Sequence, residues 1–153
     1  MDKPKGHRLR TGRFSEPNRY YLVTSVTKDR KAIFSDLWLG RIVVASLMHH
    51  HHAGHVNSLA FVVMPDHFHW LLQLTEKSSL PRLMRSVKSY TARTINAHIQ
   101  TPGRQCWQAG FHDHALRKEE ELVAVARYIV ANPLRAGLVT RLGDYPLWDA
   151  VWL

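Results

Sequence analysis

Two histidines alternate with aromatic residues in the short stretch Pro65-Asp66-His67-Phe68-His69-Trp70. Side chains alternate between the two faces of a β-strand, so His67 and His69 are expected on one face, with their Cα atoms about 7 Å apart. Two imidazoles at that spacing can share one divalent ion. The alternative is that both histidines lie on the solvent side of a sheet and bind nothing. His67 and His69 are therefore candidate metal ligands.

A tyrosine can attack a phosphodiester, but a phenol with a pKa of about 10 needs a metal or a base nearby. Two of the five tyrosines fall in expected helices. At 100° per residue, Tyr90 lies in the apolar stripe of its helix together with Leu83, Val87 and Thr94. We therefore predict that Tyr90 is a core residue.

Tyr128 lies at the edge of the apolar stripe of its own helix, in line with Glu121 and Asn132. Tyr128 and Asn132 are four residues apart, so their side chains are expected one turn from each other. A nucleophilic phenol and an amide oxygen acting as a third metal ligand would then sit on one rigid element. Glu121 could reach the same site, although acids are also common in a first helical turn because they suit the helix dipole.

Two other histidine groups are weaker metal candidates. His112 and His114 flank Asp113 on an expected strand, which would place a carboxylate on the opposite face. We rank this pair below the first and keep His114 as a possible DNA contact or support for the metal ligands. The run 49–52, all histidines, and His55 fall at the end of an expected helix, where cations are favoured and solvated. We predict an ordinary solvated cluster there.

Basic residues outnumber acidic residues by 21 to 12, which gives a formal net charge of +9. Such domains often bind polyanions, because neutralising phosphates releases condensed counterions. Residues 81–104 contain no acid. Within them, one flank of the expected helix carries four basic residues: Arg82, Arg85, Lys88 and Arg93. We predict that these residues contact DNA phosphates; the alternative is an ordinary solvated face.

The 153 residues suit one domain, and their apolar content of 45% is typical of soluble proteins. No apolar run approaches the roughly 20 residues of a membrane span, and the N-terminus has no apolar stretch typical of a secretory signal. A single cysteine, Cys106, excludes an internal disulfide and fits a reducing cytoplasm. We predict a single cytoplasmic domain over 1–153, with 1–13 as a flexible basic arm.

The elements that must position these side chains follow from periodicity and turn residues. We expect strands at 20–27, 59–64 and 67–74, a fourth strand entered through 107–116, and helices at 37–52, 80–99 and 119–132. The order β-α-β-β-α-β-α predicts an α+β, ferredoxin-like fold. This fold has an antiparallel four-stranded sheet with helices on one face, and here an additional C-terminal helix would carry Tyr128.

Taken together, these patterns resemble the REP-associated tyrosine transposases, within the HUH group of single-strand transposases. The resemblance covers residues 18–148 and rests on four sequence motifs: FVVMPDHFHWLL, the helix around KSYT, WQ followed by Phe111 and Asp113-His114, and ARYIVANPLRAGLV. One departure is Leu147 in Tyr145-Pro146-Leu147-Trp148, where an aromatic residue is expected. It bears only on how the tail packs.

The resemblance implies roles for individual residues. His67 and His69 match the paired metal-binding histidines, Tyr128 matches the nucleophile, and Asn132 matches the third ligand position. The implied protein is bacterial and acts with Mg²⁺ or Mn²⁺, as a monomer or homodimer. It would cleave and rejoin single-stranded DNA at hairpin-forming repeats through a 5′-phosphotyrosine.

Two other functions remain open from the residues alone. One is a nucleic-acid-binding module that lacks catalysis, whose hairpin binding would survive His67→Ala without any covalent adduct. The other is a hydrolytic metallonuclease in which water attacks the phosphate, so that cleavage would survive Tyr128→Phe.

Overall fold

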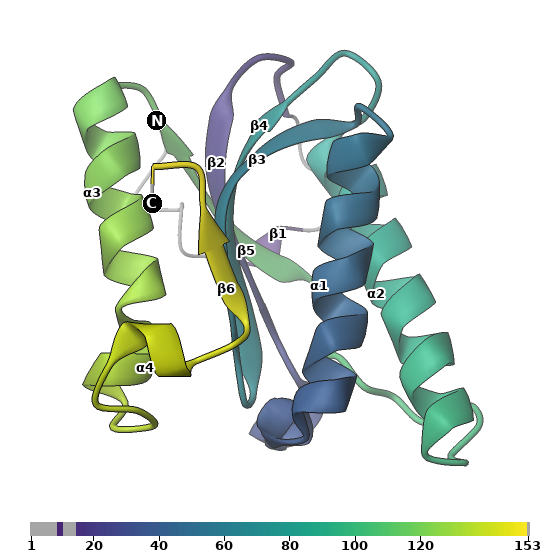
Figure 1. Cartoon of the computed structure of the whole chain (residues 1–153). Coiled ribbons are helices and arrows are strands. Elements are labelled where there is room, and N and C mark those ends of the chain that lie inside the picture. The colour runs from purple at the N-terminus through teal and green to yellow at the C-terminus, as the bar shows by residue number, and fades with distance from the viewer. Residues whose placement is uncertain (1–8, 11–14, 153) are drawn as a thin grey trace.

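The computed structural model describes residues 9–10 and 15–152, which form one antiparallel sheet with helices on both faces (Figure 1). The four long strands are β2 (Tyr20–Val26), β3 (Val56–Met64), β4 (His67–Leu74) and β5 (Phe111–Leu116). They lie in the order β5-β2-β4-β3. This is the order of the predicted ferredoxin-like arrangement, with β4 and β2 at the centre.

The sheet is wider than predicted. Two short strands, β1 (Leu9–Arg10) and β6 (Trp148–Ala150), pair with β5 and β3 and make six strands in place of four. Neither short strand has the length or alternation that marks a strand in the sequence, which is why the prediction missed both. The rest of the predicted basic arm, 1–13, lies outside the described residues.

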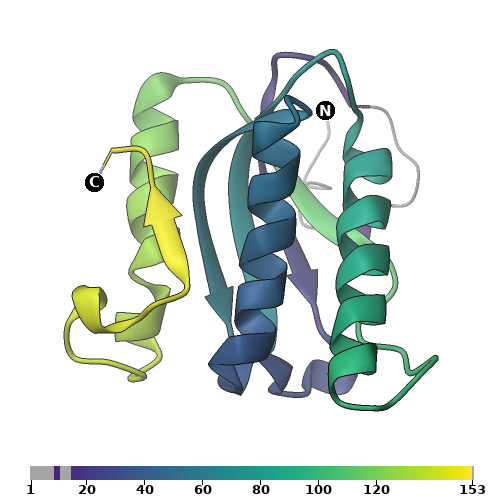
Figure 2. The same cartoon turned by 45° about the vertical axis from the view of Figure 1, so that its right-hand side comes forward.

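Two long helices, α1 (Leu37–His52) and α2 (Leu80–His98), lie side by side on one face of the sheet (Figures 1 and 2). Asp36 and Ser79 begin them, each accepting a backbone N–H with its side chain. The opposite face carries α3 (Glu119–Val130) and the short α4 (Asn132–Arg135). Short 3-10 turns at Lys28–Arg30, Ile33–Ser35 and Leu142–Asp144 complete the described elements.

The predicted helix 119–132 is divided. It ends at Val130, and α4 begins at Asn132 with Pro133 in its first turn. Proline has no N–H to donate, and its ring clashes with the carbonyl four residues earlier, so the hydrogen-bond ladder cannot continue through it. Proline is accepted in a first helical turn, and the chain therefore starts a new helix at that point.

The core side of the sheet is fixed by the aromatic residues of β4. Phe68 and Trp70 are fully buried, and the Phe68 ring lies 5.5 Å from that of Trp107, centroid to centroid. The indole N–H of Trp107 donates to Thr91 on α2. Phe68 and Trp70 therefore face α1 and α2, and the alternation of β4 turns His67 and His69 to the face that carries α3.

The C-terminal segment closes the sheet beside β3. Tyr145 donates its hydroxyl to the carbonyl of Val63, and burial raises its pKa to about 12. Leu147 accepts a hydrogen bond from the Val63 N–H and is buried against Gly40 of α1. The leucine that departs from the expected pattern is thus a packed core residue. No helix among the described residues is long and apolar enough to cross a membrane.

Candidate metal and nucleophile site

His67 and His69 are adjacent on one face of β4, as the alternation predicted. Their ring centroids are 4.9 Å apart and the ring planes meet at 76°. Both side chains are partly buried, because β4 is a central strand with β2 on one side and β3 on the other. The sheet therefore holds the two imidazoles close together.

Each imidazole has one ring nitrogen held by a neighbour. The Nδ1 atom of His69 lies 2.7 Å from the hydroxyl of Thr24, its cross-strand partner on β2. The Nδ1 atom of His67 lies 2.7 Å from Oδ1 of Asp66. Histidines that bind metal ions usually have their second nitrogen held in this way, which fixes the tautomer and the ring orientation. These contacts leave Nε2 of both rings for an ion, so the donor set fits a divalent metal.

The electrostatics also suit coordination. Burial lowers the pKa of His69 to about 4, with smaller contributions from His67 and Arg135, so its imidazole is neutral at physiological pH. Burial alone would raise the pKa of Asp66, but hydrogen bonds from His67 and Arg30 lower it overall. Neutral imidazole is the form that binds a metal, and an ionised Asp66 favours a proton on Nδ1 of His67.

Tyr128 lies on the exposed side of α3, with 63% of its surface accessible. The guanidinium carbon of Arg135 is 3.8 Å from the centroid of the Tyr128 ring. Nη2 of Arg135 also donates to Oδ1 of Asn132 at 3.2 Å. Arg135 thus joins the predicted nucleophile to the predicted third ligand, and its charge contributes to the lowered pKa of His69.

Arg135, Thr24 and Asp66 contact the predicted ligands or nucleophile, and sequence reasoning assigned none of them to the site. Arg135 follows Tyr128 by seven residues and Asn132 by three, a spacing that would have pointed to one helix face had the break at Pro133 not intervened. Thr24 could be found only from the register between β2 and β4. The roles of His67, His69, Tyr128 and Asn132 remain predictions.

The other acidic and histidine candidates have different surroundings. Glu121 accepts hydrogen bonds from the backbone N–H groups of Arg117 and Lys118, so its carboxylate caps α3. His112 and His114 share the sheet face of His69, because both His112 and His69 pair with Thr24 on opposite sides of β2. Across the described residues, no three His, Cys, Asp or Glu side chains are grouped to hold an ion. The predicted third ligand, an asparagine, belongs to none of these types.

The histidines at the end of α1 are less solvated than predicted. His50 is only 6% exposed, and its Nδ1 lies 2.8 Å from Nδ1 of His55. His51 accepts a hydrogen bond from the backbone N–H of Ser58. The reason is that the chain turns directly from α1 into β3, which brings His55 beside His50 and Ser58 beside His51.

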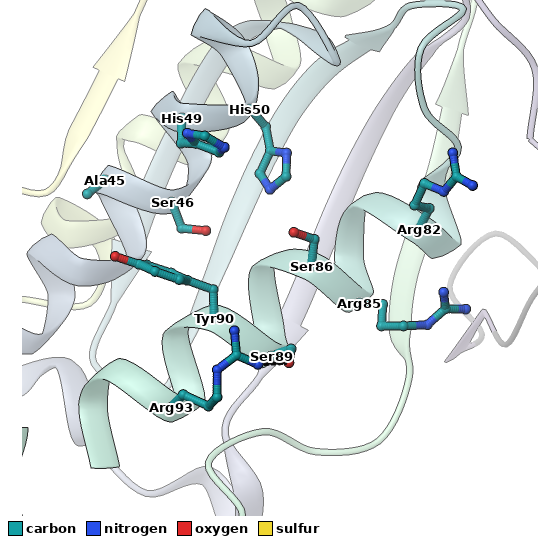
Figure 3. Close-up of a pocket in the computed structure, with 10 residues that line it drawn as sticks. All are labelled: Ala45, Ser46, His49, His50, Arg82, Arg85, Ser86, Ser89, Tyr90 and Arg93. Atoms are coloured by element: carbon teal, nitrogen blue, oxygen red, sulfur yellow. Dashed lines mark hydrogen bonds between the residues drawn. The ribbon is translucent and has the colours of Figure 1, made fainter. Parts of the chain in front are cut away.

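The basic flank of α2 is divided between two surroundings. Arg82, Arg85 and Arg93 line a cavity of about 550 Å³ between α1 and α2 (Figure 3). Lys88 lies elsewhere: its ammonium donates to the carbonyls of Gln108 and Gly110, and burial lowers its pKa to about 8. The four residues therefore do not form one continuous surface, and their contact with DNA remains a prediction.

Tyr90 is not a core residue, contrary to the prediction. It is 48% exposed and lines the same cavity (Figure 3). The buried arc of α2 is rotated toward Met84, Thr91 and Ile95, which moves Tyr90 to the edge that faces α1. Ala45, a small residue, is among the α1 residues opposite and leaves the tyrosine ring uncovered.

A family model described as IS200-like transposase matches residues 15–132. The chain is 29% identical over 98 residues to a curated Haemophilus influenzae protein named as a REP-associated tyrosine transposase. It is 27% identical over 88 residues to the REP-associated tyrosine transposase of Escherichia coli K12. These matches cover 58% and 57% of this chain, and 56% and 50% of the relatives, so the chain spans about half their length.

Solved structures share the fold. A REP-associated tyrosine transposase bound to a REP hairpin superposes with a TM-score of 0.72 at 19% identity, over 91% of this chain and 81% of the other. A Deinococcus radiodurans protein described as a transposase gives a TM-score of 0.52 at 22% identity, over 79% of this chain and 95% of the other. At these identities the likeness establishes the fold alone.

Proposed function

The chain belongs to the IS200-like transposase family, and we propose that it cleaves and rejoins single-stranded DNA at hairpin-forming sequences through a covalent bond to Tyr128. The observation that carries the proposal is the paired imidazoles of His67 and His69, each with Nδ1 held and Nε2 left for an ion. The REP hairpin bound by a protein of the same fold supports a hairpin as the substrate.

His67 and His69 would hold a divalent metal, with Asn132 as the third protein ligand. Bound there, Mg²⁺ or Mn²⁺ supplies Lewis acidity toward a phosphate oxygen. Two nitrogen donors are better matched to Mn²⁺ than to Mg²⁺, which prefers oxygen ligands. Asn132 would have to exchange its hydrogen bond with Arg135 for the metal.

Tyr128 would attack the phosphorus of the scissile phosphate. The bond from its phenolic oxygen to phosphorus forms while the bond from phosphorus to the 3′ oxygen breaks. The phenol gives up its proton, and the departing 3′ oxygen takes one up to become a free hydroxyl. The 5′ phosphate stays on the tyrosine, so attack by another 3′ hydroxyl restores a phosphodiester without an external energy source.

Arg135 would orient the nucleophile. Its guanidinium carbon lies over the Tyr128 ring, and a cation at that position restricts the ring without blocking the hydroxyl. On the other face of the sheet, DNA phosphates would be bound by Arg82, Arg85 and Arg93. Lys88 would join them if its ammonium left the carbonyls of Gln108 and Gly110. The cut strand and the rest of the DNA would then contact different parts of the protein.

The test is incubation with a labelled single-stranded hairpin and Mn²⁺, followed by denaturing electrophoresis. We expect a covalent protein–DNA adduct that mass spectrometry maps to Tyr128. The adduct should be lost in Tyr128→Phe and in the His67→Ala, His69→Ala double variant, with Tyr90→Phe as the matched tyrosine control. Cleavage that persists in Tyr128→Phe would favour a hydrolytic nuclease. Hairpin binding without an adduct at any metal concentration would favour a binding module.

A further inference from the structure

A cavity lies between α1 and α2 (Figure 3). These two helices cover the face of the sheet opposite to α3 (Figure 1). The cavity has a volume of about 550 Å³, which is within the range of ligand sites. Its lining comes from two helices that run side by side, and Figure 3 shows these side chains directed between them or along the rim: Ala45, Ser46, His49, His50, Arg82, Arg85, Ser86, Ser89, Tyr90 and Arg93.

The charge of this cavity is entirely positive. Neither α1 nor α2 contains an aspartate or glutamate, and no carboxylate among the described residues lines the cavity. Arg82 and Arg85 stand toward one end and Arg93 at the other, about 16 Å apart along α2 at 1.5 Å per residue. Arg93 donates to the hydroxyl of Ser89, which holds its guanidinium at the rim. Three exposed arginines that form no ion pair within the described part of the chain suit a polyanion.

An uncovered aromatic ring lies among these charges. The Tyr90 ring reaches from α2 across toward Ala45 and Ser46 of α1 (Figure 3). At the end of the same pair of helices, Trp38 is 58% exposed and stacks on His98. Exposed rings interleaved with arginines suit unpaired nucleotides, because a base can stack on the ring while its phosphate meets a guanidinium. A duplex would contact only the arginines, since its bases are already stacked.

We propose that the cavity between α1 and α2 binds a stretch of unpaired DNA, with a base stacked on Tyr90 and phosphates on Arg82, Arg85 and Arg93. This segment is distinct from the one at Tyr128, because the sheet separates the two sites. The inference rests on the proposed function only for the identity of the nucleic acid. Its consequence is that the protein holds DNA in two places, with the sheet between them.

Binding is measured by fluorescence anisotropy on the full chain without metal, so that no cleavage occurs. The probes are a labelled oligothymidine of about 15 nucleotides and a blunt duplex of the same length. We expect Tyr90→Leu to weaken oligothymidine binding about 5-fold or more, in line with the loss of one stacking contact, and to leave duplex binding unchanged. Tyr90→Phe should bind oligothymidine like the unmodified protein.

Arg85→Ala should weaken binding of both probes, whereas Arg141→Ala, which removes an exposed charge away from the cavity, should change neither by more than about 2-fold. A 5-iodouracil in the oligonucleotide should crosslink to α2 at Tyr90. The inference is overturned if Tyr90→Leu binds oligothymidine normally, if it loses both probes equally, or if the crosslink maps to α3. If these binding results are obtained but no Tyr128 adduct forms, the proposed function is rejected and the inference about the cavity stands.

Discussion

The guanidinium of Arg135 covers one face of the Tyr128 ring, at 3.8 Å from its centroid. Arg135 also donates to Asn132, and its charge contributes to the lowered pKa of His69. Arg135 lies in α4, the separate helical turn that begins at Asn132.

Arg135→Ala should slow formation of the Tyr128 adduct about 3- to 10-fold, because the ring loses its stacked cation and the orientation that this cation imposes. Hairpin affinity should change little. Single-turnover rates at saturating DNA separate the two effects. Arg127→Ala removes an exposed arginine beside Tyr128 on α3 and serves as the control. Equal losses in rate and in affinity would show that Arg135 binds DNA and does not position the tyrosine.

Thr24→Val should weaken Mn²⁺ binding about 10- to 100-fold, because Nδ1 of His69 loses the hydroxyl that holds it at 2.7 Å. Thr24→Ser keeps the hydroxyl and should bind Mn²⁺ nearly normally. Calorimetric titration of the metal-free protein measures both. Valine is close in shape to threonine and suits a strand, so the fold should be preserved. Unchanged Mn²⁺ affinity in Thr24→Val would place the metal away from His69.

Stability should fall as the solution is acidified from about pH 6.5 to pH 4. Burial lowers the pKa of His50 to about 4, with His55 and His49 adding to the effect. Between the two pH values the unfolded chain takes up a proton that the folded chain does not, so the free energy of unfolding decreases. In His50→Gln, the free energy of unfolding, measured by urea denaturation, should decrease less across this pH range. His52→Gln, at an exposed position, should leave the pH dependence of the free energy of unfolding unchanged. The lowered pKa of His69 contributes in the same direction as that of His50.

Lys88→Met should lower the free energy of unfolding by about 1–2 kcal/mol, because the carbonyls of Gln108 and Gly110 lose a charged donor. Arg85→Met changes an exposed side chain and should stay within about 0.5 kcal/mol. The two variants should rank the other way in DNA binding: Arg85→Met should weaken it more than Lys88→Met. Urea denaturation and anisotropy on the same two variants test both statements. A stable Lys88→Met protein with strongly reduced DNA binding would contradict them.

The elements that position the site follow closely from the sequence. The bounds of α1 and β4 are those predicted, and α2 ends within one residue of its predicted end. In each case a strong local signal sets the limit: Asp36 begins α1, Ser79 begins α2, and the Pro65-Asp66 turn precedes β4. The shared face of His67 and His69 required only the alternation of a strand.

The remainder depended on contacts between elements. Tyr90 was assigned to the core by its angle around α2, but whether a ring is covered depends on the helix opposite, where a small residue, Ala45, helps leave it exposed. Lys88 has an angle suited to DNA contact and yet is satisfied by a loop twenty residues later. Arg135 lies in α4, beyond the end of the helix predicted at 119–132, so the periodicity of that helix did not place it. None of these three outcomes can be read from one segment alone.

The short strand β6 has a consequence for how copies of this protein can meet. By pairing with β3 over Ala60, Phe61 and Val62, it covers hydrogen-bonding groups along the middle of a nine-residue strand, and over that stretch the sheet ends in a strand of only three residues. Extension of the sheet from one molecule into the next is disfavoured at so short a margin. Any self-association on this side must therefore rely on side chains rather than on shared backbone hydrogen bonds.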